Sequence, residues 1–244
     1  MRRIYLYNHR KINNSILISG EPFHYLRNVL RLKEGSQFKG FDSTGTEYLL
    51  EIKKMQPMIE ARILDESQIY QHEPIINIEF CPSLCKIKTF EHTLEKIAEL
   101  GVAKIKPVIT ERSFVLSSGH ISSKIQRWHK ILAEGTKISG SAKIPDICMP
   151  ERIENVLNQQ GINIFFWEQS EKNLKEIIPM IKQRLLDNKT IKVFIGPEGG
   201  FTEEEANLAE KTKSLIVGLG KRILSVETAT IAAIAILSYE LNEA

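Results

Sequence analysis

The chain has few cysteines, and none of them stands in a pattern that makes a familiar site. Cys81, Cys85 and Cys148 include no C-x-x-C pair and no His/Cys cluster with the spacing of a zinc site. We therefore expect free thiols in a reducing compartment, and we expect no bound metal.

Long hydrophobic runs are also missing. The most apolar tract, Ala229 to Tyr239, spans about eleven residues, whereas a membrane-crossing helix needs roughly twenty. The segment from Met1 to Arg10 has a basic start, but polar and charged residues return before a signal sequence could form. The sequence therefore predicts a cytoplasmic protein that is neither secreted nor inserted in a membrane.

Positive charge is concentrated in one segment. The net charge is only +3, but residues 104–143 carry eight basic side chains against two acidic ones, Glu111 and Glu134. A basic stripe attracts phosphate backbones, so the segment favours a polyanionic partner, with a solvated helix face as the alternative. The basic residues are Lys104, Lys106, Arg112, Lys124, Arg127, Lys130, Lys137 and Lys143.

The first 72 residues have the pattern of a small β-barrel. Short strand-like runs are separated by turn residues, and Asp42 to Gly45 supplies a hairpin turn. A helix is expected over residues 21–31, with Arg27 and Arg31 four residues apart on a face that could contact RNA. The expected strands cover residues 4–7, 15–18, 37–41, 46–52 and 58–64.

Around His72 to Pro74 the pattern changes to strands that alternate with helices, so we place a domain boundary there and expect an α/β domain over residues 73–244. The expected architecture is a mostly parallel sheet covered by helices. Gly101 is expected to end a helix that starts near residue 87. Further strands are expected over residues 76–80, 105–109, 162–166, 191–195 and 215–217, and helices near 122–138, 171–186, 203–212 and 226–241.

The sharpest local signal is the glycine-rich turn Gly196-Pro197-Glu198-Gly199-Gly200, which follows a strand. Thr202, with Glu205 three residues later, forms a capping box that starts the next helix. The turn lacks G-x-G-x-x-G and Gly-Lys-Ser/Thr, and Glu198 would repel a phosphate. A ligand without phosphate therefore suits it, with a purely structural turn as the alternative. A side chain at Gly199 is expected to obstruct that ligand.

A second glycine turn, Leu219-Gly220-Lys221-Arg222-Ile223-Leu224-Ser225, also follows a strand and precedes the most apolar helix. Because loops at the carboxyl ends of parallel strands form the ligand crevice, the two turns could face one pocket. Apolar Leu219, Ile223 and Leu224 would suit the flat faces of an adenine, and backbone groups would recognise its edges.

Further blocks accompany the two turns. Glu227-Thr228-Ala229 follows the second turn, and upstream stand Glu95 to Val102, Pro107 to Ser113 and His24 to Arg31. Together these ordered blocks resemble the SPOUT superfamily of methyltransferases, and within it the enzymes that methylate uridine N3 in 16S ribosomal RNA. The resemblance spans essentially the whole chain.

The resemblance implies a PUA-like, RNA-binding β-barrel over residues 1–72 and a SPOUT α/β domain with a trefoil knot. It also implies a homodimer, S-adenosylmethionine as the cofactor, and 16S ribosomal RNA in the small ribosomal subunit as the partner. The cofactor-binding residues would be Ile195, Gly196, Pro197, Glu198, Gly199, Gly200, Leu219, Gly220, Ile223, Leu224, Ser225 and Thr228. Candidate RNA-binding residues are His24, Arg27, Arg31, Arg112, Lys137 and Lys143.

Methylation at uridine N3 requires loss of the imide proton, and Glu198 is a candidate base. The alternative is that Glu198 hydrogen-bonds the loop or a ribose. Arg222 could stabilise negative charge on the uracil oxygens, or it could pair with Glu227 or a phosphate. N3 lies on the pairing edge, so the target must be unpaired or flipped out of its helix.

The chain departs from the family pattern at two places. Ser141 and Ser225 stand where the family usually carries arginine. Serine lacks the charge and the fork geometry of arginine, so both changes affect RNA handling more than cofactor binding. Two alternatives therefore stay open: a non-catalytic RNA-binding protein of the same fold, and a methyltransferase of another RNA position, such as a ribose hydroxyl.

Overall fold

The computed structural model describes residues 3–7, 9–42, 44–68, 76–114, 118–139, 141 and 143–242. The chain divides into two compact units. One contains Met1–Glu73 and Gly140–Lys143, and the other contains Pro74–Ser139 and Ile144–Ala244. The short segment 140–143, which the sequence analysis includes in the second domain, thus belongs to the first unit.

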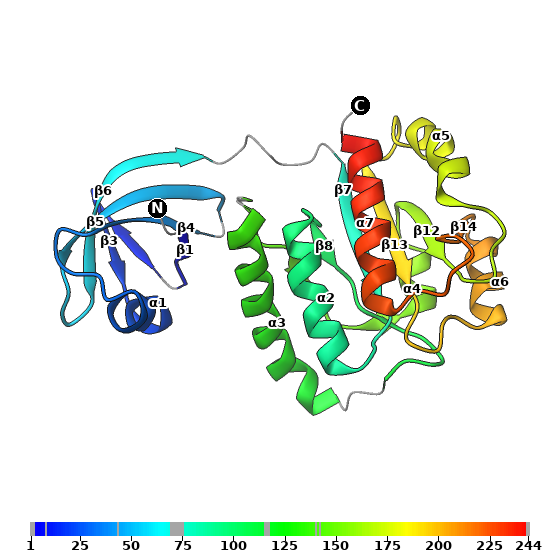
Figure 1. Ribbon diagram of the computed structural model, residues 1–244, viewed down its shortest axis with the longest axis horizontal. Helices are drawn as coiled ribbons and strands as arrows, with labels where there is room; N and C mark the ends of the chain where they lie inside the picture. The colour runs from blue at the N-terminus through cyan, green and yellow to red at the C-terminus, as the bar shows by residue number, and fades with distance from the viewer. Residues whose placement is uncertain are drawn as a thin grey trace. The chain divides into compact units, whose positions relative to one another are not determined.

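A six-stranded, mostly antiparallel sheet forms the first unit (Figure 1). Its strand order is β1-β4-β5-β6-β3-β2. Along β5 the side chains of Tyr48, Leu50 and Ile52 are buried while those between them are only half-buried, which gives the sheet one core face. The strands are β1 (Arg3–Tyr5), β2 (Arg10–Ile12), β3 (Ser15–Ile18), β4 (Gln37–Phe41), β5 (Thr46–Lys54) and β6 (Ile59–Gln68).

The helix expected over residues 21–31 is shorter and irregular. The helix α1 (Gly20–His24) is followed at once by a π-helical turn, η1 (Tyr25–Val29), and Arg31 has a left-handed φ of 52°. The prediction that Arg27 and Arg31 share one face of a regular α-helix is therefore wrong, although both residues are exposed.

Six parallel strands form the main sheet of the second unit, in the order β10-β8-β7-β13-β12-β14. The strand expected over residues 105–109 is interrupted, because Pro107 has no N–H to continue a ladder. Its second half, β9 (Val108–Ile109), pairs instead with β11 (Glu151–Arg152). The main strands are β7 (Asn77–Pro82), β8 (Lys104–Ile105), β10 (Asp146–Ile147), β12 (Ile162–Phe166), β13 (Thr190–Ile195) and β14 (Leu215–Val217).

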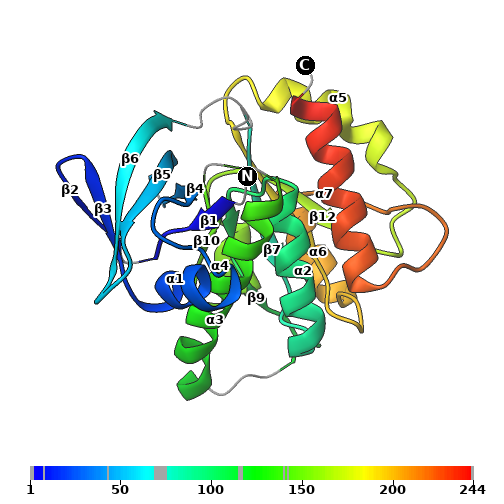
Figure 2. The same cartoon turned by 60° about the vertical axis from the view of Figure 1, so that its left-hand side comes forward.

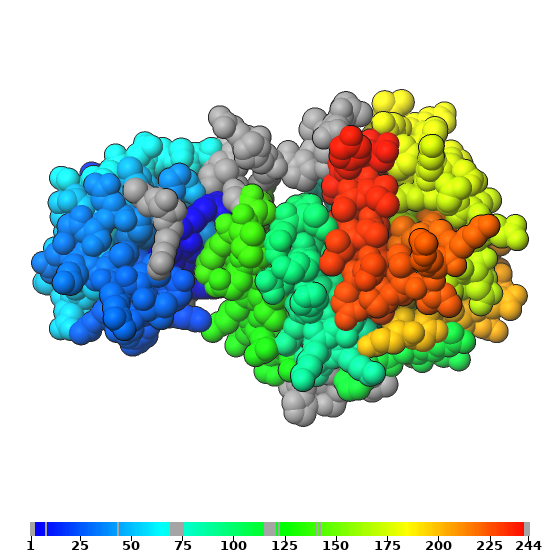
Figure 3. Space-filling model, viewed as in Figure 1, coloured from blue at the N-terminus to red at the C-terminus, as the bar shows by residue number. Residues whose placement is uncertain are grey.

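Helices cover both faces of this sheet, as predicted (Figures 1 and 2). On one face lie α2 (Ile87–Glu99), α3 (Ser118–Ser139), α5 (Leu174–Arg184) and α7 (Val226–Asn242). The other face carries α6 (Glu203–Lys211) and the short α4 (Ile153–Leu157), which the sequence analysis did not predict. Figure 3 shows α3, α2 and α7 side by side on the viewed surface.

Two predicted helix ends are confirmed. Gly101 has a left-handed φ of 77° directly after α2, and Val102 N donates to Ile97 O at 3.3 Å, which closes the helix end. At the start of α6, Thr202 and Glu205 form the expected capping box. No helix in the described ranges combines the length and apolar character that a bilayer crossing requires.

Candidate functional site

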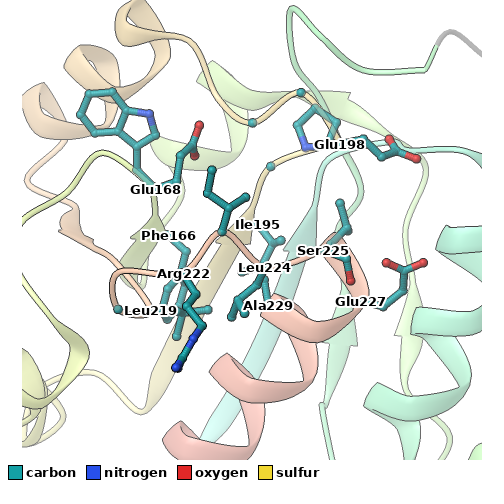
Figure 4. Close-up of a pocket in the computed structure, with 18 residues that line it drawn as sticks. Phe166, Glu168, Ile195, Glu198, Leu219, Arg222, Leu224, Ser225, Glu227 and Ala229 are labelled. Carbon is teal, nitrogen blue, oxygen red and sulfur yellow. The ribbon is translucent and has the colours of Figure 1, made fainter.

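A pocket opens at the carboxyl ends of β12, β13 and β14 (Figure 4). Its volume of about 570 Å³ lies in the usual range for small-molecule sites. The lining residues are Phe166, Trp167, Glu168, Ile195, Gly196, Pro197, Glu198, Gly199, Gly200, Leu219, Gly220, Arg222, Ile223, Leu224, Ser225, Val226, Glu227 and Ala229.

The pocket brings together the two turns that the sequence analysis singled out. Every implied cofactor-binding residue except Thr228 lines it, and so do both candidate catalytic residues, Glu198 and Arg222. Thr228 lies in α7 and donates its backbone N–H to Ser225 Oγ at 3.3 Å. The two segments follow β13 and β14, which lie on either side of β12 in the sheet, and both contribute to one cavity.

Close backbone packing shapes the first turn, residues 196–200. Gly200 has a φ of +69° and donates its N–H to Pro197 O at 2.9 Å. A Cβ at Gly196 would lie 3.1 Å from Gly200 C and from Phe201 N, so no side chain fits there without a backbone shift. A Cβ at Gly199 would instead approach the flexible Arg112 side chain, at 3.2 Å from Cδ. The geometry therefore makes Gly196 more sensitive than Gly199 to an added side chain.

Neighbouring segments anchor this first turn. Arg112 Nη1 donates to Gly199 O at 2.6 Å, and Lys86 N, at the start of α2, donates to Glu198 Oε1 at 3.2 Å. The Glu198 carboxylate is thus held against the N-terminus of α2. This geometry favours a loop-fixing role for Glu198 over that of a free general base.

The second turn, residues 219–225, is more open. Arg222 is exposed, and Ile223 is 89% exposed. In Figure 4 the Arg222 side chain extends away from the glutamates of the pocket, so the pairing with Glu227 considered above is not formed. The turn ends at Ser225, whose Oγ accepts the Thr228 N–H and caps α7.

Glu227 lies in the first turn of α7 and faces α2. Its own backbone N–H and the nearby hydroxyls of Ser225 and Thr89 lower the pKa of Glu227, although partial burial opposes them. His92 nearby acts in the same direction. Glu227 therefore remains charged in the pocket at neutral pH.

The sequence analysis missed the third contribution to the pocket, Phe166-Trp167-Glu168 at the end of β12. Glu168 lies so close to the first turn that a Cβ at Gly200 would collide with its carboxylate. The sequence could have indicated this contribution. A strand is predicted over residues 162–166, and the residues after its carboxyl end are expected at the same crevice as the two turns.

The candidate RNA-binding residues of the second unit are partly engaged within the protein. Arg112 holds the first turn, as described above. Acidic residues also neutralise part of the basic run at 104–143, so the folded segment is less basic than its composition indicates. The ion pairs of this segment include Lys106 with Glu79 at 2.8 Å, Arg127 with Glu91 at 2.7 Å and Lys137 with Glu134 at 2.5 Å.

In the first unit, His24, Arg27, Arg31 and Lys143 are exposed. The Arg27 guanidinium lies 5.8 Å from the centre of the Phe23 ring. Ser141, one of the two departures from the family pattern, accepts a hydrogen bond at its backbone oxygen from Arg3 Nη2 at 2.7 Å. This contact helps to explain how the segment 140–143 joins the first unit.

Comparison with known families gives two matches. The sequence model of an RNA methyltransferase domain matches residues 71–238, and that of an RNA methyltransferase PUA domain matches residues 18–57. Among curated relatives, the ribosomal RNA small subunit methyltransferase E of Bacillus subtilis is 27% identical and covers 91% of this chain and 89% of its own length. The protein of the same name from Buchnera aphidicola is 29% identical, with 96% and 92% covered.

Two solved structures are similar to this chain over nearly its whole length. A methyltransferase from Legionella pneumophila, solved with bound S-adenosylmethionine, has a TM-score of 0.87 at 26% identity and covers 97% of this chain and 96% of its own. The ribosomal RNA small subunit methyltransferase E of Neisseria gonorrhoeae, also bound to S-adenosylmethionine, has a TM-score of 0.85 at 28% identity, with 98% and 97% covered.

Proposed function

Because the chain belongs to the RNA methyltransferase family, we propose that it transfers the methyl group of S-adenosylmethionine to N3 of a uridine in 16S ribosomal RNA. The observation that carries this proposal is the single pocket formed by the two glycine turns after β13 and β14. Relatives with a similar chain are named for methylation of small-subunit ribosomal RNA, and two similar structures contain the cofactor.

The pocket residues fit S-adenosylmethionine. Phe166, Leu219 and Leu224 offer apolar surface for an adenine, and the backbone of residues 196–200 lines the same pocket, where its polar groups can contact the edges of a ligand. When bound, the cofactor supplies an activated methyl group on a sulfonium. The chain's own residues would then hold it in line with the acceptor nitrogen and exclude water.

We assign different roles to the two candidate catalytic residues. Arg222 is exposed at the pocket and free to approach a bound base, where it would stabilise negative charge on the uracil oxygens. Glu198 could accept the N3 proton only after giving up its hydrogen bond with Lys86 N, so we propose that it mainly positions the first turn.

The first unit supplies RNA affinity in this proposal. The PUA-domain match supports a PUA-like domain over residues 1–72, with His24, Arg27 and Arg31 among its RNA contacts. Lys143, from the segment that joins the first unit, would add to these contacts, and Arg112 and Lys137 would add others from the second unit. The methyltransferase domain would span residues 73–244.

We also propose a cytoplasmic homodimer whose second domain is a SPOUT fold with a trefoil knot. Apolar side chains support the dimer, because Ile236 and Tyr239 of α7 are 42% and 65% exposed and Ile223 is exposed beside the pocket. Sedimentation of the full chain at micromolar concentration tests it, and a monomer would contradict it.

The methylation proposal is tested with labelled S-adenosylmethionine and either protein-free 16S RNA or small ribosomal subunits, followed by mass-spectrometric mapping of the product. Label on uridine N3 is the expected result. Label on another atom would move the proposal to a different RNA position. RNA binding without any cofactor binding would instead favour a non-catalytic RNA-binding protein.

A further inference from the structure

The pocket carries an excess of negative charge. Glu168, Glu198 and Glu227 line it, and Arg222 is the one cationic side chain among its described lining residues. Such a lining attracts positively charged ligands and repels phosphate.

Two of these carboxylates are engaged by nearby donors. Glu198 accepts the Lys86 N–H at the start of α2. Glu227 lies near the start of α7, where its own backbone N–H and the hydroxyls of Ser225 and Thr89 stabilise its carboxylate and lower its pKa. Hydrogen-bond donors and helix N-termini offset part of the charge of both groups.

Glu168 differs from both. Its residue is exposed, and no hydrogen bond or ion pair to another residue in the described ranges engages its carboxylate. Its position is nevertheless defined, because the carboxylate lies against Gly200 at the junction of β12 and the first turn. Figure 4 shows it across the pocket from Glu198 and Glu227 and away from the Arg222 guanidinium.

We propose that Glu168 is a specificity-determining residue that makes the pocket prefer the cationic methyl donor over the uncharged reaction product. The inference rests on the proposed function. Methyl transfer breaks the bond between sulfur and the methyl carbon, and the electron pair of that bond stays on sulfur. The sulfonium of S-adenosylmethionine thereby becomes the neutral thioether of S-adenosylhomocysteine, whereas the remaining charges of the molecule are unchanged.

The uncompensated carboxylate therefore acts on the one charge that differs between donor and product. An exposed charge pair contributes up to about a five-fold preference, and salt screens it. Because the attraction disappears with the reaction itself, Glu168 would weaken product inhibition and favour exchange of spent cofactor.

The test is calorimetric titration of the full chain with S-adenosylmethionine, S-adenosylhomocysteine and sinefungin, which carries an ammonium group in place of the sulfonium methyl. The variant is Glu168→Gln, with Glu171→Gln as the matched control in the same loop but outside the pocket. Glu168→Asp serves as the charge-conserving rescue.

We expect Glu168→Gln to reduce the ratio of donor affinity to product affinity about three-fold, mostly through weaker binding of the donor and of sinefungin. The control should leave the ratio unchanged, the aspartate should largely restore it, and raised salt should lower it in the unchanged protein. Equal weakening of both natural ligands, or a ratio that does not respond to salt, would overturn the inference and leave the proposed function intact. Failure of the unchanged protein to bind either natural ligand would instead overturn the proposed function.

Discussion

The two glycine turns form opposite parts of one pocket but differ in how they are held. The first turn is fixed by its own backbone packing at Gly196, by Arg112 and by the contact of Glu198 with α2. The second turn is capped at its end by Ser225, but Arg222 and Ile223 within it are exposed. The first turn is therefore held by neighbouring segments, whereas the second turn exposes side chains to solvent.

This difference suggests a division of labour in binding. A prearranged backbone lowers the entropic cost of ligand binding, so the first turn should supply most of the affinity. A mobile turn can close over a bound ligand and exclude water, so the second turn should respond to the ligand. Variants in the two turns should then have unequal effects.

The largest effect is expected at Gly196. Gly196→Ala places a Cβ against the backbone of Gly200 and Phe201, so the first turn must shift. If the bound state requires the original position, and regaining it costs the roughly 2 kcal/mol typical of overpacking, S-adenosylmethionine affinity should fall roughly thirty-fold. Gly199→Ala is the matched control, because its Cβ meets only the flexible Arg112 side chain. Calorimetry that finds the two variants equally weak would mean that backbone packing does not fix the first turn.

A smaller effect is expected at the two arginines, and it separates anchoring from catalysis. Arg112→Ala removes the hydrogen bond to Gly199 O and should weaken cofactor binding about ten-fold, since hydrogen bonds with a charged partner contribute about 1.5 kcal/mol. Arg222→Ala removes the same charge from the open turn and should leave cofactor affinity within about two-fold while it slows methyl transfer. If Arg112→Ala weakens only RNA binding, the anchoring role is wrong.

The contrast between the turns was only partly predictable from the sequence. Strand positions, the capping box at Thr202 and the meeting of the two turns follow from local patterns, which depend on neighbours in the chain. The contacts of Arg112 with Gly199 and of Glu198 with Lys86 join residues far apart in the sequence. Contacts of this kind leave no local sequence pattern, so they could not be predicted.

The errors have similar physical causes. The π-helical turn at residues 25–29 depends on hydrogen bonds that the hydrophobic spacing of an α-helix does not reveal. The contribution of Glu168 was missed because its segment carries no glycine motif, although it follows a predicted strand. The positive charge of residues 104–143 was overestimated, because Glu79 and Glu91, which pair with Lys106 and Arg127, lie outside the segment in which charges were counted.

Substitutions at Ser225 test whether the cap of α7, at the end of the second turn, stabilises the protein. Ser225→Ala and Ser225→Arg both remove the hydroxyl that caps α7, so each should lower the free energy of unfolding by about 1 kcal/mol. Chemical denaturation measures this loss. The arginine variant alone should also raise RNA affinity at low salt, because it adds a cation beside the pocket. A fully stable Ser225→Ala protein would show that the cap is unimportant.

The smallest effect on stability, and the most direct test of a mobile second turn, is expected at Ile223. Its side chain is 89% exposed, so Ile223→Ser should change the free energy of unfolding by less than about 0.5 kcal/mol. If the turn closes over S-adenosylmethionine, however, the apolar side chain becomes buried in the complex, and the variant should bind the cofactor about three-fold more weakly. Leu186→Ser is the matched control, because Leu186 is 84% exposed and does not line the pocket.

Hydrogen exchange should show cofactor-induced protection over residues 219–225 that exceeds any gain over residues 196–200. Equal affinities of the two variants, together with equal protection of the two turns, would mean that the open turn does not respond to the ligand and that both sides of the pocket are equally rigid.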